Sequence, residues 1–376
     1  MARVLKEGLG GLLVLAVSIT GCRSLVPVSA CVESTRVISV PADRYCGWPT
    51  LAETREGELG VVFSGDRDDH VCPWGKVLLK RSADGGITWS DSETVANGIL
   101  DDRDAGLTRL ANGDLVVVWF TSTAFHDCVE QGLHLKVAHV HDVPSYRRHW
   151  AKLDKAAVKT ELGSFSVRST DGGRTWEPKV RIPASAPHGC VELRDGRLLV
   201  VGNEVVAEST DRAKSWHELA RLPKVPDGQV FCEAHVTEGE DGGIRCYARG
   251  REMLMYCESL DGGRTWTHPA PTKIDGSWNP PFLSRLRDGR ILMTFGRRAD
   301  ERTGVYARIG DRNGSLASLE DASEIVLYTN WDSDLGYAST VERLDGKLVT
   351  VFYAHDEETS EKASLLEVVW RLPESL

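Results

Sequence analysis

The chain has 376 residues and a formal net charge of −10 at pH 7. This acidic balance argues against general nucleic-acid binding, which relies on clustered Lys and Arg side chains that neutralise phosphates. It does not exclude an anionic small molecule, because a few clustered arginines can make a locally positive mouth on an acidic protein. The length suits one large β domain, and no Pro/Ser-rich linker or low-complexity segment divides it.

The first 21 residues have the composition of a secretory signal. Arg3 and Lys6 precede an apolar run over residues 9–19, which is too short for a typical membrane-spanning helix. The run ends in Ile-Thr-Gly-Cys at residues 19–22, which resembles the cleavage box of bacterial lipoproteins. We therefore predict a signal peptide over 1–21, lipidation of Cys22, a tether over 22–36, and an exported, membrane-anchored protein that faces the periplasm or the cell surface.

The remaining cysteines leave two interpretations open. An even number in an exported chain permits disulfides, whereas small buried thiols in inner strands are the alternative. No Cys-x-x-Cys pair occurs, so we expect no zinc site and no other metal, and nothing in the sequence calls for an organic cofactor. The eight positions are Cys31, Cys46, Cys72, Cys128, Cys190, Cys232, Cys246 and Cys257.

One short phrase occurs four times along the chain. It reads Ser-x-Asp-Gly-Gly-x-Thr-Trp at residues 82–89, 169–176 and 259–266, and has a worn copy at 209–216. The Asp and Ser/Thr side chains can bond nearby backbone groups, and the glycines supply turn conformations with positive φ. The Trp can pack on apolar surface and hold the turn down. A repeated turn of this kind indicates a repeat architecture.

A second repeat consists of β-rich runs on either side of a turn glycine, which is typical of β-hairpins. About 40–50 residues suit one four-stranded propeller blade, so six hairpins predict an all-β, six-bladed β-propeller over residues 37–376. The repeated phrase then lies between the third and fourth strands, on the outer rim. The widest gap marks an insertion, where residues 144–160 favour a short helix on the rim of blade 2. The turn glycines are Gly57, Gly113, Gly196, Gly242, Gly289 and Gly346.

The segments that flank each hairpin are expected to meet on one face of the propeller. The chain enters the first strand and leaves the second on the same side, and binding residues concentrate on such loops. These segments are rich in Asp, Glu, Arg, His, Tyr and Trp, which predicts a pocket for a polar ligand around the central channel. The candidate binding residues are Arg44, Trp48, Arg67, Arg103, Asp104, His188, His235, Arg249, Asn279, Arg297 and Asp334.

With its four repeated turns the chain resembles the sialidase superfamily, also called the BNR or Asp-box proteins. The resemblance covers residues 37–370 and extends to phrases such as Glu233-Ala-His235 and Asp334-Leu-Gly-Tyr337. It implies a propeller of the sialidase type and a retaining hydrolase of acidic sugars. Such an enzyme uses a Tyr nucleophile activated by a Glu, a separate Asp as acid/base, and three arginines that hold the carboxylate of the substrate.

The resemblance also implies roles for individual residues. Tyr337 matches the nucleophile, and Glu233 suits the carboxylate that takes its proton, because a free phenol has a pKa near 10. Asp69 or Asp68 is expected to be the acid/base. The arginines implied for the carboxylate are Arg103, Arg249 and Arg297, with Arg298 and Arg308 competing for the place of Arg297.

The sequence departs from the family at the first blade. The family has Phe-Arg-Ile-Pro there, whereas this chain has Cys-Gly-Trp-Pro at residues 46–49, so that Trp48 stands in the place of the first arginine. Arg44 is the nearest cation, but it is offset in the sequence.

We therefore expect an exported sialidase-like glycosidase that cleaves a terminal acidic sugar, with α-linked sialic acid as the expected substrate and a glycan or glycoconjugate as the partner. One alternative is a hydrolase or lyase of another uronic or deoxy sugar, with His235 or His188 as acid/base. Another is a non-catalytic carbohydrate-binding propeller in which Trp48, Trp278 and Trp331 stack on sugar rings.

Overall fold

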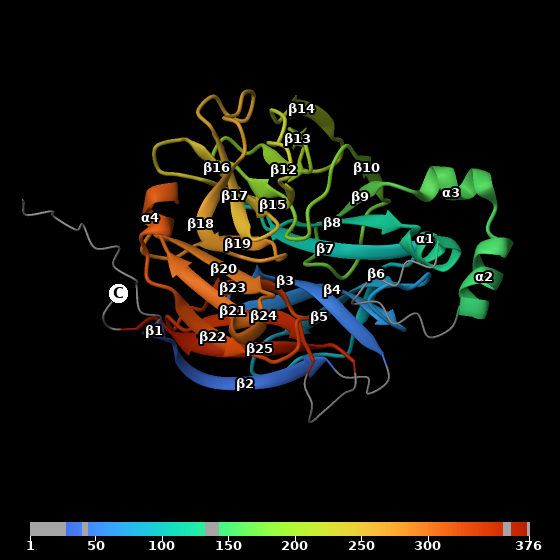
Figure 1. The fold of residues 1–376 in the computed structure, drawn as a ribbon, viewed down its shortest axis with the longest axis horizontal. Helices are drawn as coiled ribbons and strands as arrows, with labels where there is room; N and C mark the ends of the chain where they lie inside the picture. Colours follow the sequence, from blue (N-terminus) through green and yellow to red (C-terminus); the bar gives the residue numbers. More distant parts are fainter. Residues whose placement is uncertain (1–27, 40–43, 132–142, 356–361, 374–376) are drawn as a thin grey trace, which may run out of the picture.

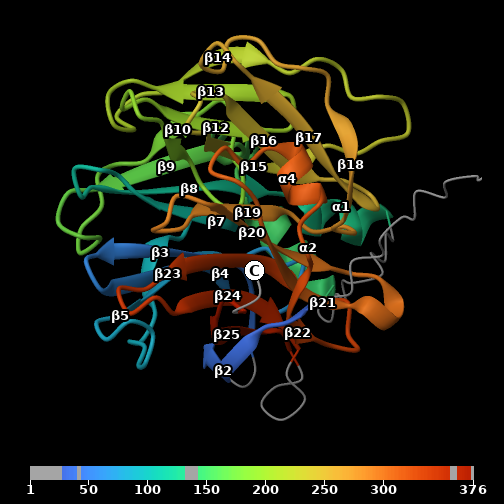
Figure 2. The ribbon, with the colours of Figure 1, turned by 90° about the vertical axis from the view of Figure 1, so that its left-hand side faces the viewer.

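The computed structural model describes residues 28–39, 44–131, 143–355 and 362–373. These residues form six small sheets in a ring, antiparallel apart from the short β1, which confirms the six-bladed β-propeller that the hairpins predict (Figures 1 and 2). It is the sialidase-type propeller that the resemblance implies. The signal peptide and Cys22 lie outside the described residues. No helix in the described segments has the length and hydrophobicity needed to cross a bilayer.

The blades follow one another along the chain, and the first strands of blades 1 and 2, of blades 4, 5 and 6, and of blades 6 and 1 contact each other around the axis. Blade 1 consists of β3 (Tyr45–Arg55), β4 (Glu58–Arg67), β5 (Lys76–Ser82) and β6 (Glu93–Ala96). Blade 2 consists of β7 (Asp101–Arg109), β8 (Leu115–Ser122), β9 (Ser164–Ser169) and β10 (Val180–Ile182). Blade 3 consists of β11 (Val191–Glu192), β12 (Leu198–Gly202), β13 (Val205–Ser209) and β14 (His217–Arg221).

The second half of the ring repeats this order. Blade 4 consists of β15 (Cys232–Glu238), β16 (Ile244–Arg249), β17 (Met253–Ser259) and β18 (Ala270–Asp275). Blade 5 consists of β19 (Pro281–Arg285), β20 (Ile291–Arg297), β21 (Gly304–Ile309) and β22 (Ile325–Thr329). It also carries the short helices η1 (Asp300–Arg302) and α4 (Leu316–Glu320). Blade 6 begins with β23 (Gly336–Glu342), β24 (Leu348–Ala354) and β25 (Ser364–Arg371).

The N-terminal strands close the ring. β2 (Cys31–Ser39) pairs antiparallel with β25 and becomes the outer strand of blade 6, and β1 (Val28–Ser29) pairs parallel with β22 of blade 5. The last blade is therefore built from both ends of the chain. The structure places residues 28–36, which we predicted to be part of a tether, inside the propeller.

The four repeated turns connect the third and fourth strands of blades 1 to 4, as the sequence predicts. In the first turn, Oδ1 of Asp84 accepts the Thr88 backbone N–H at 2.8 Å and Oδ2 accepts the Thr88 hydroxyl at 2.6 Å. The other three turns contain the same pair of bonds. Blade 5 has an equivalent that the sequence did not reveal, in which Asp311 accepts from the N–H and hydroxyl of Ser315 at 3.0 and 2.7 Å. This copy was missed because residues 309–316 lack the first Ser, the paired glycines and the Trp of the phrase.

Three helices interrupt blade 2 between β8 and β9, where we predicted one short helix. They are α1 (Ala124–Gln131), α2 (Val143–Lys152) and α3 (Lys155–Glu161) (Figure 1). The buried Tyr146 packs with Phe125 and Val71, and its hydroxyl donates to the Val71 carbonyl at 3.3 Å. The insertion therefore rests on the loop that follows β4, and is not confined to the rim of blade 2.

All eight cysteines within the described residues are free thiols. Six of them are buried, Cys232 is half-buried and Cys31 is exposed. The burial of these six residues agrees with the expectation that the cysteines are small core residues of the strands.

Candidate active site

In each blade, one residue in or just before the start of the first strand has a left-handed backbone conformation. In blades 1, 2, 4 and 6 it lies nine residues before the turn glycine of the hairpin, and the pairing of the first two strands is irregular there. A bulge of this kind redirects a side chain. The six positions are occupied by Trp48, Asp104, Gly189, Glu233, Trp278 and Tyr337, with φ from 50° to 88°.

Tyr337, Arg249 and Glu233 form the central contact of the site. Nη1 of Arg249 lies 2.9 Å from each carboxylate oxygen of Glu233 and 3.2 Å from the hydroxyl oxygen of Tyr337. The arginine donates all of these bonds, which leaves the Tyr337 hydroxyl proton free for another acceptor. The structure thus brings together the two residues predicted as nucleophile and base, with one guanidinium nitrogen between them.

Tyr337 is held in a protonated state and in a fixed position. Burial, followed by the charges of Glu233 and Asp104, raises the pKa of Tyr337 well above its usual value of 10. Its backbone N–H donates to Oδ1 of Asn279 at 3.3 Å. Gly336 packs on the same amide so closely that a Cβ there would lie 1.6 Å from Oδ1. Asn279, predicted to bind substrate, therefore fixes the start of β23.

Asp104 lies beside this cluster and is only 4% exposed. Burial raises the pKa of Asp104 to about 6, with Glu233 adding to the shift and Arg103 opposing it. Nε of Arg103 lies 3.7 Å from Oδ1 of Asp104, which is beyond hydrogen-bond distance. A buried carboxyl group whose pKa is near neutral suits a proton donor.

Trp48 forms a wall of the site and is 1% exposed. The guanidinium carbons of Arg103 and Arg67 lie 4.3 and 4.9 Å from its ring centroid. Arg67 is committed to a buried ion pair with Asp101, in which Nη2 and Oδ2 are 2.9 Å apart. Arg67 and Trp48, both predicted to bind substrate, are thus enclosed by protein groups. Arg103 is left as the cation that faces Asp104.

Asp334 anchors a second polar cluster on the same wall. It accepts the hydroxyl protons of Tyr45 and Tyr353 at 3.0 and 3.2 Å, and Nδ1 of His70 lies 3.3 Å away. Burial lowers the pKa of His70 despite the neighbouring carboxylate, so the ring is neutral at pH 7. Asp334 was predicted to bind substrate, but its oxygens are already engaged by these side chains.

Arg298 faces the site, whereas Arg297, the residue that we expected there, points into blade 5. The predicted residue, Arg297, donates to both oxygens of Glu324 at 2.9 and 2.6 Å inside blade 5. Arg298 instead donates to the Leu335 carbonyl at 3.0 Å and to the Tyr353 hydroxyl. Successive side chains point to opposite faces of a strand, so only one of two adjacent arginines can face the site. Strand alternation thus separates the two arginines, but it does not say which of them faces the site unless the register of the strand end is known.

The loop after β4 holds the two aspartates predicted as acid/base. Oδ1 of Asp68 lies 2.7 Å from Nη1 of Arg44, and both side chains are partly exposed. Asp69 is 8% exposed and accepts the His70 backbone N–H at 2.8 Å. Arg44, just before β3, also lies 3.4 Å from Asp66 at the end of β4, so it pairs with these aspartates and is not seen in contact with Tyr337 or Glu233.

His188 and His235 lie in the channel between Tyr337 and the end where the hairpin turns lie. The ring centroids of His188 and Tyr337 are 6.2 Å apart, and His235 stacks on Phe282 at 4.8 Å. Nδ1 of His235 accepts the Leu283 backbone N–H at 3.0 Å. Burial lowers the pKa of His235 to about 3 and holds the pKa of His188 well below its usual value, so both residues form a neutral floor. Nowhere in the described segments do three or more His, Cys, Asp or Glu side chains gather in a way that could hold a metal ion.

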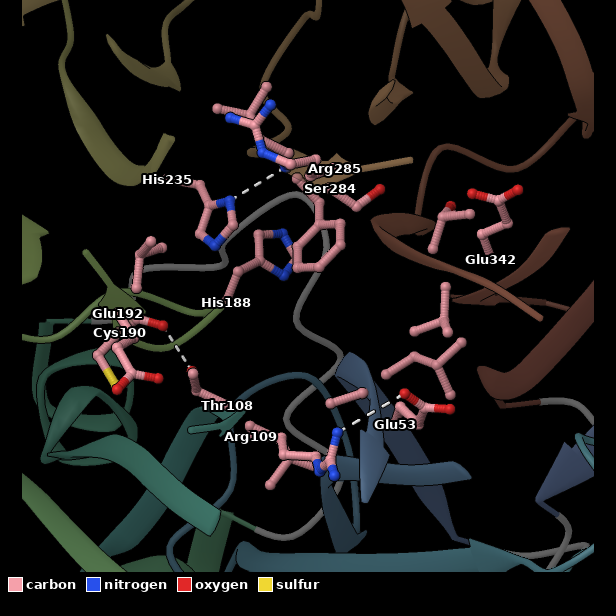
Figure 3. A pocket seen from close by; sticks show the side chains of 18 of the residues that line it. Glu53, Thr108, Arg109, His188, Cys190, Glu192, His235, Ser284, Arg285 and Glu342 are labelled. Carbon is pink, nitrogen blue, oxygen red and sulfur yellow. Dashed lines mark hydrogen bonds and ion pairs between the residues drawn. The ribbon is translucent and has the colours of Figure 1, made fainter. Parts of the chain in front are cut away.

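A cavity of about 650 Å³ occupies the other end of the channel, where the hairpin turns lie. His188 and His235 line its inner end, and Glu53, Arg109, Glu192 and Arg285 surround it (Figure 3). Its size is that of a small-molecule site. We nevertheless place the candidate active site at the opposite end, because Tyr337, Glu233 and Asp104 do not line this cavity.

Unpartnered polar atoms cluster at the active-site end of the channel. Within the described residues, seven buried side-chain nitrogen or oxygen atoms have no hydrogen-bond partner. Because native proteins leave few such groups unpaired, a cluster of them indicates where a polar ligand binds. Five of the seven line the site or its floor, namely Arg103 Nε, Asp104 Oδ1, His188 Nε2, Arg249 Nε and Asn279 Nδ2.

Comparison with known proteins agrees with the fold. The BNR repeat-like domain family matches residues 141–349, which is more than half of the chain, and the protein belongs to this family. It is a member of the sialidase superfamily. A protein of Bacteroides fragilis named sialidase is 25% identical over 252 residues, which is 58% of this chain and 42% of the relative. The match thus spans less than half of that relative.

Solved structures extend the similarity to nearly the whole chain. A Dyadobacter fermentans protein of unknown function has a TM-score of 0.72 at 20% identity, and the match covers 91% of this chain and 99% of that chain. The NanB sialidase from Streptococcus pneumoniae has a TM-score of 0.58 at 14% identity and covers 92% and 71%. The Hadza microbial sialidase Hz136 has a TM-score of 0.61 at 15% identity and covers 87% and 66%. At these identities the likeness shows the fold alone.

Proposed function

We propose that this protein is a glycosidase of the sialidase type that removes a terminal acidic sugar, with α-linked sialic acid as the substrate. The observation that carries the proposal is the contact in which one nitrogen of Arg249 bridges Tyr337 and Glu233. The relative from Bacteroides fragilis, which is named a sialidase, supports the same class of reaction.

In the proposed reaction, the Tyr337 oxygen attacks the anomeric carbon while its proton passes to Glu233. A neutral phenol suits this carbon because the sugar carries a carboxylate there, which would repel an anionic nucleophile. We propose that Asp104, in place of the Asp68 or Asp69 expected from the resemblance, donates its proton to the leaving oxygen as the glycosidic bond breaks, because burial raises its pKa to about 6. Water then attacks the glycosyl-tyrosine and gives a proton to Asp104, while Glu233 returns its proton to the Tyr337 oxygen as the bond to the sugar breaks, and the configuration of the sugar is retained.

Three arginines are available for the carboxylate of the sugar. Arg249 and Arg298 flank Tyr337, and Arg103 lies over the indole of Trp48 at 4.3 Å. We propose that Arg103 compensates for the arginine that is replaced by Trp48. Guanidinium groups bind carboxylates in a bidentate way, and Nε of both Arg103 and Arg249 has no hydrogen-bond partner among the described residues.

The test is the turnover of a fluorogenic α-sialoside by the wild type and two matched variants. Tyr337→Phe should lower kcat at least a hundredfold, because it removes the nucleophile. Tyr256→Phe is the control, since its hydroxyl bonds to Glu258 in blade 4, away from the site, and it should stay within about twofold of the wild type. Equal turnover by Tyr337→Phe and the wild type, or no turnover by either, would contradict the proposal.

A carbohydrate-binding propeller without catalysis is the second candidate. It is favoured by the enclosure of Tyr337, which is 2% exposed, and by Trp278 and Trp331, which are 39% and 70% exposed. Exposed aromatic rings suit stacking on sugars. If the wild type turns over no sialoside, binding on a glycan array, lost in the Trp278→Ala variant, would support this function.

We also propose that the protein acts outside the cytoplasm, anchored through a lipid on Cys22. The basic and apolar residues that precede Cys22 support this proposal. Labelling of the wild type but not of Cys22→Ser with a fatty-acid probe in the native host would test it.

A further inference from the structure

Two cysteines face each other inside blade 4. Cys246 lies on β16 and Cys257 on β17, and they are directly opposed partners in the antiparallel pairing. Directly opposed residues place their side chains on the same face of a sheet, with Cα atoms about 4.5–5.5 Å apart. This separation falls within the range of about 4.4–6.8 Å that a disulfide allows.

The surroundings of the two thiols isolate them from other chemistry. Both side chains are fully buried and pack in one apolar cluster with Ala248 and Met255. Burial, together with the Cys257 thiol, which is close enough to form a hydrogen bond, raises the pKa of Cys246 well above its usual value. The thiolate that exchange chemistry needs is therefore scarce in the folded protein. A cross-link would have to form before the blade packs, and would then be protected from reductants.

We propose that Cys246 and Cys257 form a disulfide when the chain folds in the presence of a disulfide oxidant. One thiol, as the thiolate, attacks the S–S bond of the oxidant and gives a mixed disulfide and one released thiol. The second protein thiolate then attacks that mixed disulfide, forms the S–S bond between β16 and β17, and releases the second thiol of the oxidant. Two protons and two electrons leave the protein, and the oxidant is reduced to two thiols.

The cross-link would fix the strand that carries part of the candidate site. β16 ends at Arg249, and its other neighbour is β15, which carries Glu233. A short loop that is closed by a disulfide reduces the entropy of the unfolded chain. The proposal does not depend on the glycosidase function, because the pair lies in the core of the blade and does not contact the site.

The test is to refold the full chain with oxidised and reduced glutathione and to map its thiols. The denatured product is alkylated with iodoacetamide, reduced, and then alkylated with N-ethylmaleimide. We expect the second label on Cys246 and Cys257, and the first label on the buried Cys190, which serves as the internal control. The first label on all three residues would overturn the proposal.

A stability measurement provides a second readout. A disulfide that closes the short loop from Cys246 to Cys257 is expected to raise the Tm of a large domain by about 5 °C. Dithiothreitol, added during refolding, should therefore lower the Tm of the wild type and of Cys190→Ala by this amount. It should leave the Cys246→Ala/Cys257→Ala variant unchanged. Equal responses of the wild type and the double variant would contradict the cross-link.

Discussion

At the scale of single residues, the site depends on five side chains that occupy left-handed backbone positions. These positions are Trp48, Asp104, Glu233, Trp278 and Tyr337. For an L-residue with a Cβ this conformation costs about 1–2 kcal/mol. Strain of this kind persists only where the surrounding structure enforces it, and it concentrates at functional sites. The bulges at the starts of these strands direct reactive side chains from different blades toward one another.

The strain is measurable at Trp278, whose side chain is the most exposed of the five. Glycine adopts a positive φ without penalty whereas alanine does not. We predict that Trp278→Gly is more stable than Trp278→Ala by about 1 kcal/mol in chemical denaturation. At Trp331, which is exposed and does not have a positive φ, the order should be equal or reversed. A more stable alanine variant at position 278 would show that the residue is unstrained.

The role of Asp104 gives a prediction for the pH dependence of activity. A proton donor must be protonated, and the pKa of Asp104 is raised to about 6. kcat/KM should therefore be present below pH 6 and fall about tenfold per unit above it. Asp104→Asn should lose a factor of about 10² to 10⁴ and should also lose this limb of the pH profile.

Asp102 supplies the matched control for that profile. Burial also raises the pKa of Asp102 to about 6. Its carboxylate, however, already accepts hydrogen bonds from Nε1 of Trp119 at 2.8 Å and from the Gly98 backbone N–H at 2.6 Å. Asp102→Asn should keep the fall in activity near pH 6. If the fall survives in Asp104→Asn or disappears in Asp102→Asn, Asp104 is not the donor.

Part of the site was predictable from the sequence, and the rest was not. The hairpins placed Tyr337, Glu233, Arg249 and Arg103 on one face, because strand direction alone decides which ends meet. The choice between Arg297 and Arg298 depended on one step of strand alternation, which fails when the register of a strand end is unknown. The pKa of Asp104 depends on burial by neighbouring blades, and no local pattern contains that information.

At the scale of elements, the ring is held closed by β2 and its contacts with blade 1. Nε of Arg36 on β2 donates to Oε1 of Glu367 on β25 at 2.8 Å, and Nη1 donates to the Ile87 carbonyl in the first repeated turn at 2.8 Å. Trp89 of that turn donates Nε1 to Oε2 of the same carboxylate at 3.0 Å. One buried carboxylate thus joins the last blade to the first.

We predict that Arg36→Ala destabilises the protein by about 2 kcal/mol. Removal of one partner of a buried pair costs roughly 3–5 kcal/mol, and we reduce this value because the Arg36 side chain is partly exposed to solvent, which screens its charge. Arg221→Ala is the control, because its pair with Glu218 is exposed at the surface, and it should cost less than about 1 kcal/mol. Equal losses in urea denaturation would show that the closure does not depend on this pair.

The sequence analysis did not predict that β2 pairs with β25 and closes the ring, and the reason is physical. Most of β2 is exposed, with only its last residues buried, so it shows none of the alternation that marks a half-buried strand. Its partner, β25, lies at the opposite end of the chain. A pairing over such a separation leaves no local sequence signal.

At the scale of the whole molecule, the propeller brings together residues from all parts of the chain. Its blades are local units of similar length, which is why the number of sheets and the position of the repeated turns could be predicted from hairpins and spacing. The helical insertion of blade 2 rests on the loop after β4 and so ties blade 2 to blade 1. The site itself exists only when the ring is closed, because Trp48 of the first blade contacts Tyr337 of the last.

The most direct test of the proposed reaction is to trap the glycosyl-enzyme. The protein is incubated with a sialic acid derivative that carries fluorine at the anomeric carbon and at its neighbour, which slows hydrolysis of the intermediate, and the labelled peptide is sequenced by mass spectrometry. The account predicts a single adduct on the oxygen of Tyr337, absent from Tyr337→Phe and still formed in Tyr256→Phe. An adduct on another residue, or an unmodified protein, would contradict it.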